Sequence, residues 1–199
     1  MQFAVLFVCT GNICRSPTAE RMLRHRLSGR LGPSMPFAVT SAGTGALVGA
    51  PIYPDAARLL TQSGVDIDGF AARDLAKSMV ESADVVLAMT REHRAATARL
   101  APRALPKLFT LREFARTLAE NRDAWPSTTD PLERARALLA LAQQVRGKAG
   151  PVDRSMDDVP DPYRRSAQHY DEAWALISAA VDIVVEAVSP GKGSAFQRA

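Results

Sequence analysis

The feature that most constrains this chain is an apolar run that leads through a short loop directly into the start of a helix. The run Phe3–Val8 is continuously apolar and rich in β-branched and aromatic residues, which predicts a strand buried on both faces, as in a parallel sheet. Ser16 and Pro17 are typical of an N-cap and a first helical position, and this helix is predicted to end near Gly29. The loop that starts at Cys9 therefore lies between a buried strand and the positively polarised end of a helix.

Strand and helix patterns alternate along the rest of the chain. Apolar β-branched runs predict strands, and apolar residues at helical spacing predict helices. Strands are predicted over Phe37–Ser41, Ala83–Met89 and Lys107–Leu111, and helices over Pro54–Ser63, Arg91–Leu100 and Asp171–Val188. This alternation predicts an α/β fold, a three-layer sandwich in which a four-stranded parallel sheet is flanked by helices.

The segment at about residues 112–156 departs from this alternation. It contains two helical patterns, Leu111–Ala119 and Leu132–Val145, but too few apolar residues for a core of its own. We therefore expect a single domain over residues 1–188, with a helical elaboration at about 112–156. Residues 189–199 are expected to form a disordered tail.

The loop Cys9–Ser16 combines a Cys-x5-Arg spacing with its place before a helix. Unpaired N–H groups at a helix start, together with amides turned inward by a tight loop, form a nest for a tetrahedral oxyanion, so this is predicted to be a phosphate-binding loop. Gly11 is expected to relieve the strain of the turn, and Arg15 to bind two phosphate oxygens. Cys9 is then placed beneath the phosphorus as a thiolate that the amides and Arg15 stabilise, with the Ser16 hydroxyl as a further donor.

A thiolate beneath a phosphate is placed for in-line attack, and the surrounding donors stabilise the charge of the transition state. The leaving oxygen then needs an acid. Asp161 lies between Pro160 and Pro162, in a rigid loop that can hold a carboxyl group towards the site. On spacing alone, Asp157 and Asp158 remain alternatives for this role.

The two cysteines of the chain, Cys9 and Cys14, have four residues between them. A disulfide that closes so small a loop adds little stability, and two cysteines without a matching pair of histidines do not form a zinc site. They are therefore either inert core thiols or reactive ones. The histidines His25, His93 and His169 are predicted to be surface or packing residues.

Composition limits the class of protein and of partner. No apolar run approaches the roughly 18–20 residues of a membrane span. The apolar start Met1–Cys9 is short and lacks a basic leader, so we expect a cytoplasmic protein, with export by a signal-independent route left open. The formal charge is +4, and the 25 basic residues are scattered among acidic ones without a basic tail or a basic and aromatic stripe. We therefore expect neither nucleic-acid binding nor membrane insertion.

Together these segments resemble the low-molecular-weight protein tyrosine phosphatase family. The most specific part of the match is Val8–Pro17, joined late in the chain by Val159–Tyr163. Segments similar to those of the family also occur at Ser41–Thr44, Ala72–Leu75, Ala83–Thr90 and His93. The resemblance covers the predicted fold except for the elaboration and the tail.

The resemblance implies hydrolysis of phosphotyrosine in proteins through a phosphocysteine intermediate. It implies that Cys9 is the nucleophile, that Arg15 binds phosphate and stabilises the transition state, and that Asp161 acts first as acid and then as base. The implied substrate- and phosphate-binding residues are Thr10, Gly11, Asn12, Ile13, Cys14, Ser16, Ser41 and Tyr163. The implied partners are a tyrosine-phosphorylated protein as substrate and inorganic phosphate as product, with no metal or organic cofactor.

More specific roles also come from the resemblance. Asn12 and Ser41 are expected to brace the loop by hydrogen bonds, and Ile13 and Tyr163 to form walls around the substrate ring. Cys14 is expected to trap the oxidised nucleophile as a reversible disulfide.

The sequence departs from the family at two places, and three alternatives stay open. Phe70 or a neighbour stands where many relatives carry a histidine, and the region before the acid loop is longer than usual. Thioredoxin-coupled arsenate reductases look similar around the loop but need further cysteines downstream. Protein-arginine phosphatases tend to carry threonine where Ile13 stands. The intact set of Cys9, Arg15 and Asp161 argues against the third alternative, a phosphate-binding adaptor without turnover.

Overall fold

In the residues that the computed structural model describes, 2–146 and 153–189, a parallel sheet of four strands runs in the order β2–β1–β3–β4. The strands are β1 (Phe3–Cys9), β2 (Phe37–Gly43), β3 (Val85–Ala88) and β4 (Leu108–Thr110). Phe3 pairs with Phe37 across β1 and β2, and Val5 pairs with Val85 across β1 and β3. The four-stranded parallel sheet predicted from the alternation of elements is thus confirmed.

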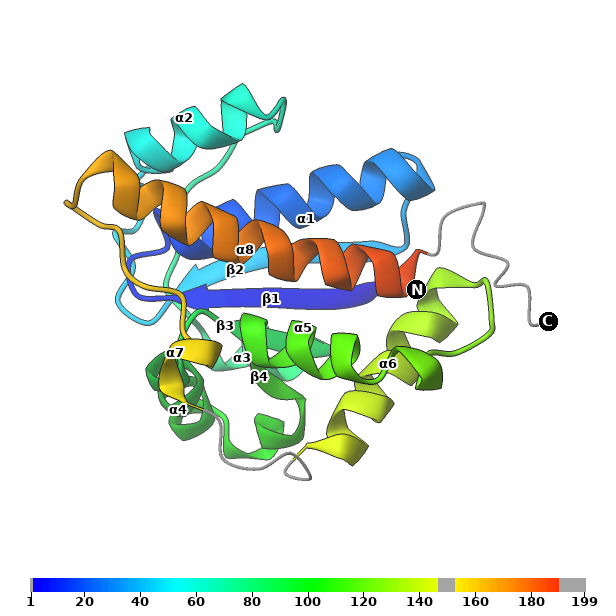
Figure 1. Cartoon of the computed structure of the whole chain (residues 1–199). Coiled ribbons are helices and arrows are strands. Elements are labelled where there is room, and N and C mark those ends of the chain that lie inside the picture. Colours follow the sequence, from blue (N-terminus) through cyan, green and yellow to red (C-terminus); the bar gives the residue numbers. More distant parts are fainter. Residues whose placement is uncertain (1, 147–152, 190–199) are drawn as a thin grey trace.

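Helices cover both faces of the sheet (Figure 1). They are α1 (Arg15–Leu31), α2 (Pro54–Gln62), α3 (Lys77–Ser82), α4 (Arg91–Leu100), α5 (Leu111–Glu120), α6 (Pro131–Val145), α7 (Arg154–Asp157) and α8 (Ala167–Val188), with 3-10 turns η1 (Pro102–Lys107) and η2 (Arg122–Ala124). One layer contains α1, α5, α6 and α8, and the opposite layer contains α3 and α4. This arrangement is the predicted three-layer sandwich.

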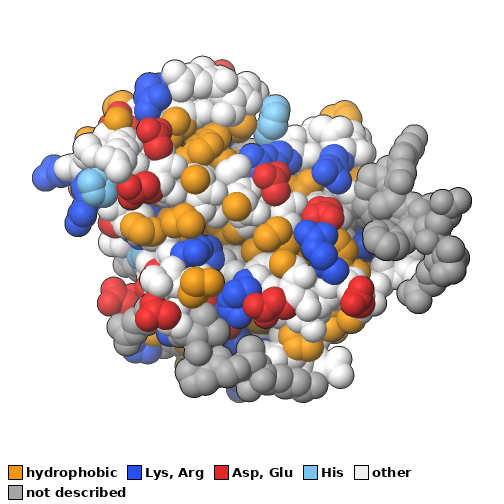
Figure 2. All heavy atoms as spheres, viewed as in Figure 1, with side chains coloured by type: hydrophobic (Ala, Val, Ile, Leu, Met, Phe, Trp, Pro, Cys, Tyr) orange, Lys and Arg blue, Asp and Glu red, His pale blue; other side chains and the backbone are white. Residues whose placement is uncertain are grey.

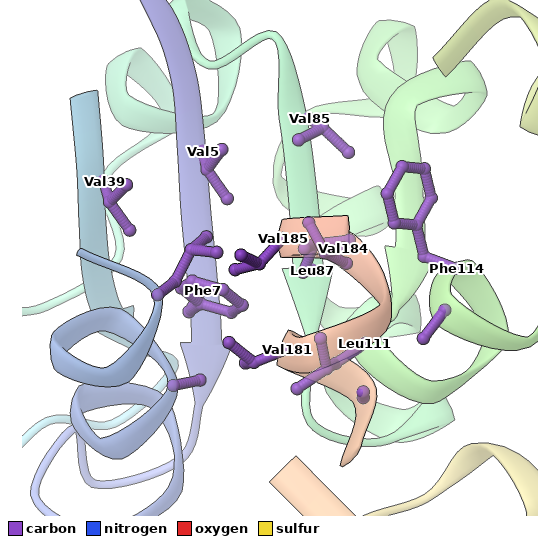
Figure 3. Packing of buried hydrophobic residues seen from close by; sticks show 14 of the residues in the cluster. Val5, Phe7, Val39, Val85, Leu87, Leu111, Phe114, Val181, Val184 and Val185 are labelled. Atoms are coloured by element: carbon purple, nitrogen blue, oxygen red, sulfur yellow. The ribbon is translucent and has the colours of Figure 1, made fainter. Parts of the chain in front are cut away.

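The side chains of β1 alternate between two hydrophobic cores. Phe3, Val5 and Phe7 pack beneath α1, α5 and α8, whereas Leu6 and Val8 pack against α3, α4 and η1. Figure 3 shows the first of these cores, where strand side chains face the valines of α8. A strand buried on both faces has no polar side to present, which explains the unbroken apolar run in the sequence.

The first helix differs from its prediction at both ends. It begins at Arg15, with Cys14 as the N-cap residue, so the assignment of Ser16 as N-cap and Pro17 as first helical residue is wrong. The Ser16 hydroxyl is instead hydrogen-bonded to the Cys9 sulfur, and this contact takes it away from the helix end. The helix also continues past Gly29 to Leu31, because the left-handed backbone that ends it is at Gly32, with φ +86°.

Boundaries elsewhere shift by a few residues. The predicted strand Lys107–Leu111 ends at Thr110, where a capping box between the Thr110 hydroxyl and Glu113 starts α5. The last helix begins at Ala167, before the predicted Asp171. The short helices α3 and α7 were not predicted, because pieces of four to six residues carry too few turns for a periodic pattern.

The elaboration at about 112–156 packs into the main core. Phe114 and Leu118 of α5 and Leu138 of α6 are buried in the same cluster as Phe7. This shared core is our reason for proposing a single domain over residues 1–188. Residues 147–152 of the elaboration lie outside the described residues, as do residues 190–199 of the predicted tail.

Charged side chains of both signs are interspersed on the face that carries α5 and α8 (Figure 2). This mixture agrees with the scattered basic residues in the sequence. Within residues 2–146 and 153–189, no helix has both the length and the apolar content that crossing a membrane requires.

Candidate active site

The loop between β1 and α1 turns its carbonyl groups outward. The backbone N–H groups of Thr44, Gly45, Leu47 and Tyr53 donate to the carbonyl oxygens of Cys9, Thr10, Gly11 and Ile13, at N···O distances of 2.8–3.2 Å. Gly43 permits this close approach, because a Cβ atom there would lie 2.2 Å from the Thr10 carbonyl oxygen. Since the N–H of a peptide points away from its C=O, outward carbonyls leave the loop amides facing inward, around the end of β1.

Asn12 makes the sharp turn in this loop. Its φ is +53°, the left-handed region that asparagine tolerates better than most residues. The expectation that Gly11 relieves the strain is therefore wrong, because Gly11 does not adopt a positive φ. Three hydrogen bonds hold the Asn12 side chain: Oδ1 accepts from the Arg73 backbone N–H at 2.9 Å, and Nδ2 donates to Ser16 Oγ at 3.0 Å and Ser41 Oγ at 2.8 Å.

These contacts fix the direction of a hydrogen-bond chain that ends at Cys9. Asn12 Nδ2 can only donate, so Ser16 Oγ accepts from it and directs its own proton to Cys9 Sγ, 2.9 Å away. By the same reasoning Ser41 accepts from Asn12 and donates to Glu20 Oε2 at 2.6 Å. Cys9, Asn12, Ser16, Ser41 and Glu20 are all buried. The Ser16 hydroxyl is thus oriented to stabilise a Cys9 thiolate.

Arg15 links the loop to the segment that carries the acid candidate. Its Nη1 donates to the Val159 carbonyl oxygen at 3.1 Å, and its Nη2 lies 2.9 Å from Asp161 Oδ2. Among the residues that the structure describes, no group accepts a hydrogen bond from the buried Nε of Arg15. This donor is therefore available to an oxyanion bound in the loop.

A cavity of about 200 Å³ opens above Cys9. It is lined by Cys9, Thr10, Gly11, Ile13, Cys14, Arg15, Gly45, Leu47, Asp161 and Tyr163. The ring of Tyr163 packs edge-on against Tyr53, with 5.3 Å between centroids, and this contact steadies one wall. Of the three acid candidates, Asp161 lines this cavity, whereas Asp157 and Asp158 are bound to Arg91.

Cys14 is a buried thiol next to the cavity. Burial is the main cause that raises its pKa, to about 12, and the Tyr170 hydroxyl at 4.0 Å from Sγ opposes this shift only in part. Both cysteines are free in the structure. Cys14 is therefore a neutral thiol at physiological pH, unlike a group that serves as the attacking thiolate.

His93 lies directly behind the loop, a place that sequence reasoning did not assign to it. Its Nε2 is 2.8 Å from Thr10 Oγ1, and its Nδ1 is 2.8 Å from Oγ1 of Thr90, the N-cap residue of α4. Burial is the main cause that lowers the pKa of His93 to about 4, and the nearby Arg15 cation lowers it further. A neutral imidazole then ties the residue after Cys9 to the start of α4.

This lowered pKa makes folding sensitive to acid. As pH falls below about 6.5, the unfolded chain binds a proton at His93 before the folded protein does, so stability that is present at neutral pH is lost towards pH 4. We expect the group to contribute about 2 kcal/mol to the difference in unfolding free energy between about pH 7 and pH 4.5. Urea unfolding of His93→Gln should lack this contribution, whereas His25→Gln, on the exposed side of α1, should keep it. An unchanged pH dependence in His93→Gln would contradict the assignment.

Several residues around the site were not predicted to belong there. Glu20 and His93 reach it from α1 and α4, Leu47 and Tyr53 from the loop between β2 and α2, and Arg73 from the loop between α2 and α3. One signal was available for Glu20, which lies four residues after Ser16 and so shares its face of the helix. In the described part of the chain, no group of three or more His, Cys, Asp or Glu side chains is arranged to hold a metal ion.

The site contains a cysteine beneath inward-facing amides, an arginine at the helix start and a carboxylate at the cavity edge. Together these groups define a cysteine-based oxyanion site on an α/β sandwich. Residues 4–146 match the family described as low molecular weight phosphotyrosine protein phosphatase, and the chain belongs to this family. A cysteine-based mechanism is characteristic of its members.

Individual relatives agree with this membership. The chain is 36% identical over 179 residues to the low molecular weight protein-tyrosine-phosphatase Etp of Escherichia coli K12, with 89% of this chain and 88% of Etp covered. The structure of Vibrio vulnificus Wzb in complex with benzylphosphonate is similar at a TM-score of 0.65 and 25% identity, covering 94% of this chain and 99% of Wzb. The YwlE arginine phosphatase from Geobacillus stearothermophilus is similar at a TM-score of 0.64 and 27% identity, with coverages of 92% and 91%.

Proposed function

We propose that this protein hydrolyses phosphotyrosine in proteins, with Cys9 as nucleophile, Arg15 as phosphate ligand and Asp161 as general acid and base. The observation that carries the proposal is the donor set around one sulfur atom: the Ser16 hydroxyl at 2.9 Å from Cys9 Sγ, the inward loop amides and the Arg15 guanidinium. Such donors favour the thiolate and complement the charge of a transferring phosphoryl group.

In the first step, the phosphate group enters the loop and is bound by the amides and by Arg15 Nε. The Cys9 thiolate attacks phosphorus from the floor of the cavity, so a sulfur–phosphorus bond forms while the bond to the leaving oxygen breaks. Asp161, at the edge of the same cavity, gives its proton to that oxygen. A phosphate oxygen that takes over Arg15 Nη2 from Asp161 would release the carboxyl group for this task.

In the second step, the Asp161 carboxylate takes a proton from a water molecule that attacks phosphorus. The sulfur–phosphorus bond breaks, inorganic phosphate leaves, and the Cys9 thiolate is restored. The same carboxyl group thereby returns to its protonated form. All atoms and protons balance without a metal ion or an organic cofactor.

The walls of the cavity support an aromatic substrate. Ile13, Leu47 and Tyr163 line it above Cys9, and apolar walls of this kind favour a flat ring over a flexible polar chain. Benzylphosphonate, the compound bound by Vibrio vulnificus Wzb, is itself an aromatic phosphonate. We propose a tyrosine-phosphorylated protein as the substrate. We also propose that the enzyme itself is located in the cytoplasm.

A phosphoarginine substrate is the second candidate, because the YwlE arginine phosphatase has the same fold. Ile13 at the cavity wall favours phosphotyrosine, because its apolar side chain can pack against an aromatic ring. The guanidinium group of phosphoarginine needs hydrogen-bond acceptors, which the Ile13 side chain does not offer.

Phosphate release from matched phosphotyrosyl and phosphoarginyl peptides separates the two candidates. We expect kcat/KM to be at least about tenfold higher for the phosphotyrosyl peptide, the scale of one lost polar or apolar contact in a binding pocket. Ile13→Thr should narrow this ratio, while Leu100→Thr, at an exposed position at the end of α4, should leave it unchanged. A wild-type preference for phosphoarginine would overturn the proposed substrate.

Cys14 is the proposed partner of an oxidised nucleophile. If Cys9 is oxidised to a sulfenic acid, the Cys14 thiol can condense with it to a disulfide and release water. Both cysteines line the cavity above Cys9, which supports this pairing.

A further inference from the structure

Asp157 is a buried carboxylate four residues before the proposed acid, and the whole residue is 4% exposed. Two arginines bind it. Arg91 of α4 donates to Oδ2 through Nε at 2.9 Å and Nη2 at 2.5 Å, and Arg116 of α5 donates to Oδ1 through Nη2 at 3.0 Å. A carboxylate is buried in a protein only where it is paired and hydrogen-bonded, and Asp157 meets both conditions.

The residues on either side of Asp157 are held by the same two helices. The Arg91 backbone N–H donates to Asp158 Oδ1 at 2.7 Å. Arg112 of α5 donates through Nη1 to the carbonyl oxygens of Ser155 at 2.5 Å and Asp158 at 2.8 Å. We call Arg91, Arg112 and Arg116 the arginine clamp. Figure 1 shows α7, which ends at Asp157, beside α4 and α5.

From the clamp the backbone continues under restraint to the active site. The Val159 N–H donates to the Met89 carbonyl oxygen at 2.8 Å, which ties the segment to the end of β3. The Val159 carbonyl oxygen accepts from Arg15 Nη1, and Asp161 then reaches Arg15 Nη2. Each residue from Asp157 to Val159 thus has a fixed contact. The Asp161 side chain is 51% exposed and is held at Oδ2 by Arg15 and at Oδ1 by the Tyr163 backbone N–H, at 3.2 Å. The segment before Asp161 therefore fixes the backbone from which this carboxyl group reaches the cavity edge.

We propose that Asp157, bound by Arg91 and Arg116 of the arginine clamp, is a positioning residue that holds the Asp161 carboxyl group at the cavity edge for proton transfer. This inference rests on the proposed function. A buried ion pair adds little net stability compared with apolar packing. We infer that the contribution of Asp157 is to fix one geometry, the one in which its carboxylate keeps both arginine partners. General acid catalysis needs such precision, since the carboxyl group must lie within hydrogen-bond distance of the leaving oxygen.

Two aryl phosphates that differ in their leaving group test this role. Phenolate, released from phenyl phosphate, is a poor leaving group, so its departure depends on protonation by the acid. 4-Nitrophenolate, released from 4-nitrophenyl phosphate, is a good leaving group and depends on the acid less. For Asp157→Asn we expect kcat/KM, which reports formation of the phosphocysteine intermediate, to fall about tenfold or more with phenyl phosphate and less than about threefold with 4-nitrophenyl phosphate. Inhibition by inorganic phosphate should stay within about twofold, because the phosphate loop is untouched. Equal losses with both substrates would overturn the inference.

A second background separates positioning from a merely structural effect. In Asp161→Asn, the acid that Asp157 positions is gone, so adding Asp157→Asn should change kcat by less than about twofold. A double variant whose fold-loss in kcat equals the product of the two single losses would overturn the inference. Should Asp157→Asn fail to fold, Arg116→Gln removes one of the two partners and should show the same dependence on leaving group.

Glu113→Gln is the matched control. Glu113 is also a carboxylate on two arginines, Arg94 at 2.6 Å and Arg146 at 3.2 Å, and its side chain is 12% exposed. Its carboxylate also accepts from the Thr110 backbone N–H at the start of α5, so its side chain binds other partners than the acid segment. We expect Glu113→Gln to lower stability without changing the ratio of the two kcat/KM values; a changed ratio would count against a specific role for Asp157. An inactive wild type overturns the proposed function as well, whereas an active wild type with an unaltered ratio in Asp157→Asn overturns only this inference.

Discussion

Cys9→Ser should lower kcat for a phosphotyrosyl peptide by about 10⁴-fold or more, the scale seen when an enzyme loses its nucleophile. Serine keeps the size and the contact to Ser16 but stays a protonated alcohol at neutral pH, so it lacks the anion that attacks phosphorus. Phosphate release measured with the purified variant checks this result. No other change in the chain is expected to have a larger effect on turnover.

Binding of phosphate provides the control for this variant. The loop amides and Arg15 remain in Cys9→Ser, so inorganic phosphate should still bind with an affinity within about tenfold of wild type. Loss of both binding and turnover would point to a damaged fold instead of a missing nucleophile. Turnover within about tenfold of wild type would show that Cys9 is not the attacking group.

Asp161→Asn should lower kcat by about 10²- to 10³-fold, within the range of general acid–base catalysis. Asparagine matches the shape of the carboxyl group but neither gives a proton to the leaving oxygen nor takes one from water. KM should change much less, because phosphate contacts come from the loop and from Arg15. The measurement is steady-state phosphate release at saturating substrate.

Asp182→Asn is the control for this prediction, because Asp182 pairs with Arg26 at 3.0 Å on the side of α8 that packs along α1. It should turn over at the wild-type rate. If Asp161→Asn were fully active, the acid would have to be another carboxylate near the site. The ion pair between Arg15 and Asp161 would then have only a structural role.

The sheet and the loop were predictable because their signals are local. The apolar run Phe3–Val8 and the helix after it predict a strand, a loop and a helix start without any knowledge of partners. The roles predicted for Cys9 and Arg15 follow from that position, since a helix start offers unpaired N–H groups wherever it occurs. The buried core of the last helix was predictable for the same reason, from its regular spacing.

The bracing of the loop was not predictable from local patterns. The left-handed turn falls on Asn12 instead of Gly11 because Asn12 gains three hydrogen bonds from Arg73, Ser16 and Ser41, two of which come from distant segments. Propensity alone favours glycine for such a turn, and tertiary contacts outweigh it here.

The structure also adds to the case for one acid candidate. The sequence favours Asp161, which lies between Pro160 and Pro162, but spacing alone leaves Asp157 and Asp158 as alternatives. The fold separates them, because α4 and α5 bring arginines to Asp157 and Asp158, whereas Asp161 reaches the cavity. Residues so far apart in the chain produce no periodic signal that one sequence could reveal.

Alkylation of Cys9 tests most directly whether its sulfur is held as a thiolate in an oxyanion site. Iodoacetamide modification at about pH 6.5, followed by mass spectrometry, reports an activated sulfur, because an ordinary cysteine thiol reacts slowly at that pH. Cys14 serves as the internal reference, since burial raises its pKa to about 12 and should keep it unmodified. We expect Cys9 to be modified at least about tenfold faster than the thiol of a short unstructured peptide, and vanadate to protect it. A rate equal to that of the peptide thiol, with no protection by vanadate, would contradict the oxyanion site.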